Sequence, residues 1–95
     1  MANSPFIGGS FDDSNLSGRT LNRHYIGTSF KRTNLSLAKL TGDFTNVSLQ
    51  DASLVGATLT GAFTLVNFRG TGVMRQHLAG ARRVTRVTLS DGTLY

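Results

Sequence analysis

The chain repeats itself with a 19-residue period, and this period constrains the fold more than any other feature of the sequence. Four units follow one another, at 11–29, 30–48, 49–67 and 68–86. Large apolar residues recur in four columns: Phe11, Phe30, Leu49 and Phe68; Leu16, Leu35, Leu54 and Val73; Leu21, Leu40, Leu59 and Leu78; and Tyr25, Phe44 and Phe63, with Arg82 breaking the last column. A fixed period of this length is typical of a solenoid, in which successive coils stack along one axis.

The spacing within each unit predicts a four-sided β coil. Neighbouring columns are 5, 5, 4 and 5 residues apart, which matches neither the helical nor the strand period. A four-sided turn fits, because one large residue on each side points inward together with a small residue two positions earlier. The side before Tyr25 and Phe44 is one residue short. Gly42, Gly61 and Gly80 stand there, and we expect glycine dihedrals to tighten that corner.

Five-residue units within this period resemble a known repeat family. The segments 14–18, 33–37, 38–42, 52–56 and 57–61 are similar to the A-(D/N)-L-x-x unit of pentapeptide-repeat proteins, and the resemblance covers residues 4–87. It implies a right-handed quadrilateral β-helix with four units per coil, and a mostly non-enzymatic role. The coil here is one residue shorter than four such units. The sequence therefore predicts a single all-β solenoid domain, 1–95, of about four coils with short caps.

Both ends of the stack are expected to depart from the repeat. Phe6 lies one full period before Tyr25 and predicts a partial first coil, with Pro5 interrupting edge pairing. Residues 84–89 alternate like a strand, 90–93 form a turn, and 94–95 fold back. A short helix over 74–82 is a further expectation, weakened by Gly80. The segment 87–95 either caps the stack or joins a second copy end to end, and we favour a dimer through Leu89, Leu94 and Tyr95.

The charge of the chain is positive and unevenly placed. Ten basic and five acidic residues give a net charge of +5, and no acid lies between Asp51 and Asp91. The basic side chains of the last coil are Arg69, Arg75, Arg82, Arg83 and Arg86. They either solubilise the end of the stack or attract an acidic partner. Between the first coils, Asp12 should face Lys31, and Arg32 should face both Asp13 and Asp51.

No catalytic or metal-binding pattern is evident in the sequence. The chain has no Cys and no Glu, and His24 and His77 are the only histidines. We therefore predict a non-enzyme without cofactor or metal. The N-terminus resembles no leader peptide, and no apolar run reaches the ~18 residues of a membrane span. A cytoplasmic protein of bacterial or phage origin is the expectation.

Three binding functions remain open. The first is a protein-binding module that uses Val55 and Met74, exposed stacked neighbours by repeat arithmetic, together with the arginines of the last coil. The second, implied by the resemblance, is interaction with a type II topoisomerase such as gyrase as a protection or inhibitor protein. The net positive charge argues against mimicry of DNA. The third is weak binding to nucleic acid or an anionic surface through Arg69, Arg75, Arg82, Arg83 and Arg86.

Overall fold

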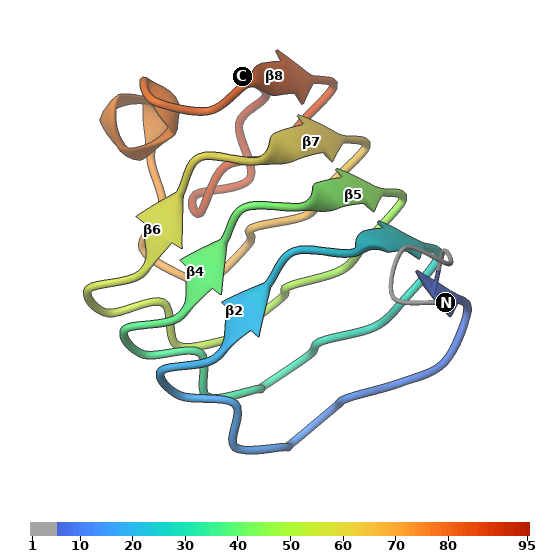
Figure 1. The fold of residues 1–95 in the computed structure, drawn as a ribbon. Coiled ribbons are helices and arrows are strands. Elements are labelled where there is room, and N and C mark those ends of the chain that lie inside the picture. The colour runs from blue at the N-terminus through green and yellow to red at the C-terminus, as the bar shows by residue number, and fades with distance from the viewer. Residues whose placement is uncertain (1–5) are drawn as a thin grey trace.

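The computed structural model describes residues 6–95 as a parallel β-solenoid of about four coils (Figure 1). Pro5, which was expected to interrupt edge pairing, lies outside the described residues. One sheet has the order β1-β3-β5-β7-β8 and the other β2-β4-β6. The elements are β1 (Phe6–Ile7), β2 (Thr20–Leu21), β3 (His24–Ile26), β4 (Lys39–Leu40), β5 (Asp43–Thr45), β6 (Thr58–Leu59), β7 (Ala62–Thr64), the 3-10 turn η1 (Arg75–Leu78) and β8 (Arg83–Thr85).

The register of the strands confirms the fold prediction. Tyr25 is paired with Phe44 and Phe44 with Phe63, each one repeat period further along the chain. In the second sheet Leu21 pairs with Leu40 and Leu40 with Leu59 at the same spacing. All these pairs are parallel, as expected when each coil returns to lie directly on the one before it.

The apolar columns fill the interior of the coils. Phe30, Leu35 and Leu40 are completely buried. The rings of Tyr25 and Phe44 stack with centroids 5.1 Å apart, and those of Phe44 and Phe63 at 5.4 Å. These distances are close to the ~4.8 Å between neighbouring strands, so the ring stack follows directly from the strand register. Each fully buried side chain contributes about 1.5–3 kcal/mol, and this column is the main source of stability.

Three corners of the coil are turned by residues with positive φ. These residues form three columns, which are Asp13, Arg32, Asp51 and Gly70; Gly18, Leu37 and Gly56; and Gly8, Gly27, Asn46, Leu65 and Arg86. Among the described residues, none at the fourth corner, before β3, β5 and β7, has positive φ. Four five-residue units would give a coil of 20 residues, and the coil here has 19. The fourth corner is therefore the one that is shorter by one residue.

Glycine at the fourth corner is required by close approach between coils. A Cβ on Gly42 would lie 2.1 Å from the Arg23 carbonyl oxygen, and one on Gly61 would lie 2.1 Å from the Gly42 oxygen. Neither glycine has a positive φ. The expectation of a tightened corner was right, but its cause is space and not backbone dihedral. Gly80 was wrongly grouped with them, because a Cβ there would meet nothing within 4 Å.

The last coil is longer than the repeat predicted. Phe63 pairs with Val84 and Asn67 with Thr88, so the 19-residue period is lengthened by two at this place. The coil therefore runs over 68–88, and the boundary expected at residue 86 is wrong. The two additional residues lie between Leu78 and Val84, after η1 has taken the place of a strand over β6. Val84 restores the fourth column, and Arg82 is displaced to the surface.

The two ends of the chain follow the sequence prediction in part. Phe6 pairs with Tyr25, so a partial coil precedes residue 11. At the other end the chain folds back, with Thr88 bridged to Leu94 and the Tyr95 amide donating to the Val87 carbonyl at 2.9 Å. Leu89 is 3% exposed and belongs to the core. Leu89 therefore cannot contribute to the expected dimer surface. The other two residues of that expected surface, Leu94 and Tyr95, are exposed.

We predict that Gly61→Ala and Gly80→Ala differ sharply in stability. The first substitution forces a methyl group against backbone in the coil below and should cost about 3 kcal/mol or more. The second enters open space and should change stability by less than about 0.5 kcal/mol. Urea denaturation followed by circular dichroism measures both. Equal midpoints would contradict the close-approach explanation.

Candidate functional site

A groove of about 370 Å³ opens between the third coil and η1. Its walls come from the turn that precedes β6, from β6 itself and from the segment that leads into η1 (Figure 1). The lining residues are Leu54, Val55, Gly56, Ala57, Leu59, Thr71, Gly72, Val73 and His77. None of them carries a permanent charge. We call this feature the η1 groove.

The groove exists because η1 does not continue the sheet above β6. In the coils below, the Thr58 amide donates to the Ala38 carbonyl and the Gly61 amide to the Leu40 carbonyl. One coil higher, the His77 amide bonds within its own turn to the Met74 carbonyl. The Met74 amide in turn donates to His77 Nδ1 at 2.9 Å, which closes the turn.

The upper edge of β6 is consequently left without a strand partner. Repeat positions predict that the Ala57 and Leu59 carbonyls should accept backbone hydrogen bonds from the last coil, and among the described residues neither receives one. The 3-stranded sheet ends at β6. A strand edge with free carbonyls is therefore exposed beside an apolar surface.

Exposure of the core leucines shows how far the groove reaches inward. Leu35 and Leu40 in the second coil are 0% exposed, whereas Leu54 and Leu59 at the same places in the third coil are 8% and 7% exposed. The value for Leu21, at the open end of the stack, is also 8%. The third coil on this side is thus covered no better than a terminal coil.

An apolar ridge lies beside the groove at the corner after the second column. Val55 is 73% exposed and Leu37, one coil below, is 68% exposed. The Leu37 amide donates to the Val55 carbonyl at 2.8 Å, which holds the two corners together. Met74 differs from the expectation, because it is half-buried and packs against the core instead of standing exposed above Val55.

The arginines of the last coil do not form one patch. Arg82 pairs with Asp43 and approaches the Thr41 carbonyl, whereas the Arg75 guanidinium lies 4.6 Å from the centre of the Tyr95 ring. Arg83 is on β8, while Arg69 and Arg86 lie near other corners of the coil. Sequence proximity suggested a cluster, but a four-sided coil distributes neighbouring residues over different sides.

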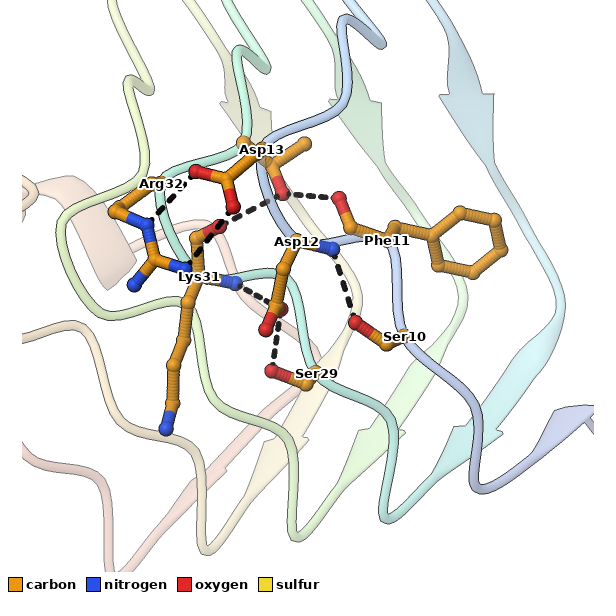
Figure 2. A network of polar contacts seen from close by, with 8 residues as sticks. Ser10, Phe11, Asp12, Asp13, Ser29, Lys31 and Arg32 are labelled. Atoms are coloured by element: carbon orange, nitrogen blue, oxygen red, sulfur yellow. Dashed lines mark hydrogen bonds and ion pairs between the residues drawn. The ribbon is translucent and has the colours of Figure 1, made fainter.

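A network of polar contacts joins the first two coils (Figure 2). Arg32 donates to both carboxylate oxygens of Asp13, at 2.8 and 3.0 Å, as the repeat predicted. Asp12 instead accepts from the Ser29 hydroxyl at 2.5 Å and from the backbone amide of Lys31 at 2.9 Å. The ammonium of Lys31 forms no ion pair within residues 6–95, and neither do Arg32 and Asp51 with each other.

These contacts lower the pKa of both carboxyl groups. The pKa of Asp12 falls below its ordinary value because the Ser29 hydroxyl and the Lys31 amide donate to the ionised form. The pKa of Asp13 falls because the Arg32 guanidinium donates to it. Asp13 is exposed and Asp12 is partly exposed, so the network orders the corner without fully burying a charge.

One buried hydroxyl in the next coil lacks the partner that its equivalent has. Ser29 donates to Asp12, but Ser48, one coil further on, has a buried Oγ with no hydrogen-bond partner among the described residues. Lys31 occupies the place of Asp12 in that coil and offers no acceptor. The two coils therefore share the serine but not its acceptor.

Within residues 6–95, a contact between His24 and Thr45 is the one that most resembles part of a catalytic site. His24 Nε2 lies 3.3 Å from the Thr45 hydroxyl, while the nearby Asp43 carboxylate is paired with Arg82. An activated hydroxyl requires a base that is itself oriented by a third group, and no such contact to His24 is found there. The same residues contain no group of three or more His, Cys, Asp or Glu arranged to hold a metal ion. No helix in this part of the chain is long and apolar enough to cross a bilayer.

Comparison with known proteins supports the repeat assignment. A family model described as pentapeptide repeats (8 copies) matches residues 43–71, which span the third coil and parts of its neighbours. With the parallel solenoid, this match supports the resemblance to pentapeptide-repeat proteins that the sequence shows. Searches of the curated proteins and of the solved structures give no significant match.

Acid should destabilise the protein through the Asp12 and Asp13 carboxyl groups. Their folded pKa values lie below the unfolded value of about 3.9, so their stabilisation is complete above that pH and is lost as the pH falls through the folded values. In Asp13→Asn the loss between pH 4 and pH 2 should be smaller than in the wild type. Urea midpoints measured over this range test it, and identical pH profiles would refute it.

Two equivalent serines should respond oppositely to truncation. Ser29→Ala removes a hydroxyl that is bonded to a carboxylate and should lower the urea midpoint. Ser48→Ala removes a buried hydroxyl without a partner, and it should leave stability unchanged or raise it by about 1 kcal/mol. A lower midpoint for Ser48→Ala than for Ser29→Ala would show that the structural difference between the coils has no energetic consequence.

Proposed function

We propose that the protein is a binding scaffold whose η1 groove accepts an extended apolar segment of a partner protein. The repeat solenoid is consistent with a non-catalytic scaffold. The observation that carries the proposal is the unpaired edge of β6, where the Ala57 and Leu59 carbonyls face a groove without permanent charge. A peptide strand added there would donate amides to these carbonyls.

The dimensions and chemistry of the groove favour this occupant. A volume of about 370 Å³ accommodates one or two apolar side chains of a peptide. Val55 at its rim is 73% exposed and would be covered by the added strand. The backbone supplies affinity and the groove selects apolar side chains at alternate positions. No residue that lines the η1 groove carries a permanent positive charge, so the groove does not favour the phosphates of a nucleic acid.

The other candidate functions gain no comparable support. Nucleic-acid binding through the last coil relied on a single cluster of five arginines, whereas only Arg82 and Arg83 line a common hollow and Arg82 is paired there with Asp43. Topoisomerase interaction remains a prediction from the family resemblance, and no observation on the described residues favours it over another protein partner.

The proposal predicts the kind of peptide that the protein selects. From a displayed library of random heptapeptides, the wild type should enrich sequences that alternate apolar and polar residues. Val55→Asp should weaken a selected synthetic peptide about tenfold or more, because it introduces a charge into the apolar groove. Leu65→Asp is the matched control, since Leu65 is 48% exposed at another corner, and it should leave the affinity unchanged.

Backbone pairing is tested with the same peptide. N-methylation at alternate residues that donate to Ala57 and Leu59 should abolish binding, whereas N-methylation at the intervening residues should have little effect. Equal losses for both methylation patterns, equal losses for Val55→Asp and Leu65→Asp, or a native dimer mass that Val55→Asp abolishes would refute the proposed peptide site.

A further inference from the structure

A second hollow lies on the outer face of the five-stranded sheet, away from the η1 groove. It measures about 430 Å³ and crosses β3, β5, β7 and the start of β8. The residues around it are His24, Asp43, Thr45, Ala62, Thr64, Arg82 and Arg83. In contrast to the η1 groove, its walls are mainly polar and charged.

Strand register explains why the face is hollow at this place. His24, Asp43, Ala62 and Arg83 are paired in sequence across the sheet, so their side chains form one outward row. Ala62 is the small member of this row, and it leaves a depression between the longer side chains of Asp43 below and Arg83 above. The cation at the edge of the hollow depends on the lengthened last coil, because a 19-residue coil would have placed Ala81 and not Arg83 over Ala62.

A second outward row supplies hydroxyl groups along the same depression. Thr45 is paired with Thr64, and Thr64 with Thr85, two positions further along each strand than the first row. The Thr45 hydroxyl contacts His24 Nε2 at 3.3 Å. The Thr64 hydroxyl and the Arg83 guanidinium have no side-chain hydrogen bond or ion pair with the described residues, so both are available to a ligand.

The charge of the hollow is positive once its internal pair is discounted. Arg82 is bonded to Asp43 through Nη2, and these two charges neutralise each other. Arg83 remains as an uncompensated cation at the edge of the depression. A guanidinium fork combined with hydroxyl donors from a neighbouring row suits a tetrahedral oxyanion, whose oxygens point in several directions.

From these observations we propose that this hollow binds a phosphate group, with Arg83 and Thr64 as its principal donors and Thr45 and His24 completing the site. Asp43 contributes by holding Arg82 along one side of the depression. The proposal is independent of the peptide site, since the two surfaces share no lining residue.

The experiment is a titration of the ¹⁵N-labelled protein with inorganic phosphate at constant ionic strength. Saturable amide shifts are expected at Thr45, Ala62, Thr64 and Arg83. Arg83→Gln should weaken binding about tenfold, and Thr64→Val should weaken it several-fold, because each removes a donor to the anion. Arg69→Gln removes the same charge from a different side of the last coil and should leave the affinity unchanged.

Further arms separate phosphate recognition from general attraction of anions. Methyl phosphate should bind about as well as inorganic phosphate, and acetate should shift the same amides only weakly. Linear shifts without saturation, equal effects of Arg83→Gln and Arg69→Gln, or equal binding of acetate would each overturn the phosphate site. Circular dichroism and melting of Arg83→Gln establish that it is folded, and Thr64→Val gives an independent reading of the same site.

Discussion

The inward apolar column is the interaction on which the rest of this structure depends. Each coil must place its large residues directly over those of the coil below, because only then does the interior close against water. This requirement fixes the parallel register and stacks the rings of Tyr25, Phe44 and Phe63. It also explains why a coil one residue short is tolerated only where Gly42 and Gly61 let the backbone of adjacent coils approach closely. Outer-face neighbours such as Asp13 and Arg32 are then a consequence of the same register.

Both candidate binding surfaces arise where the last coil departs from that register. η1 replaces a strand, which leaves the edge of β6 unpaired and opens the apolar groove beside Val55. The two additional residues then shift the chain, so that Arg82 reaches Asp43 and Arg83 comes to lie over Ala62. A regular 19-residue coil would have paired β6 and placed Ala81, not Arg83, over Ala62. The irregular last coil therefore contributes to both candidate binding surfaces.

Sequence periodicity was sufficient to predict the columns, the parallel coils, the partial coil at Phe6 and the fold-back of the C-terminus. The prediction from periodicity failed in the last coil. Adding 19 to Phe63 placed Arg82 in the fourth column, whereas the apolar Val84, two positions later, occupies it. That error also misplaced Leu89, which continues the core above Phe68. The groove and the hollow could not be predicted, because they depend on which backbone groups remain unpaired and which side chains are small across three or four coils. A search for the apolar residue that best completes each column would have found Val84.

The most direct test of the account is disulfide formation between engineered cysteines, since the chain contains none of its own. Thr45→Cys with Thr64→Cys joins strand neighbours within the regular repeat, and Thr64→Cys with Thr85→Cys joins strand neighbours across the lengthened coil; both pairs are within reach of a disulfide. Thr64→Cys with Arg83→Cys keeps the 19-residue spacing into the last coil, but the two residues are not paired. Mild oxidation should cross-link the first two variants rapidly and the third slowly. Rapid cross-linking of the third variant, with slow reaction of Thr64→Cys/Thr85→Cys, would contradict the shifted last coil and the two surfaces derived from it.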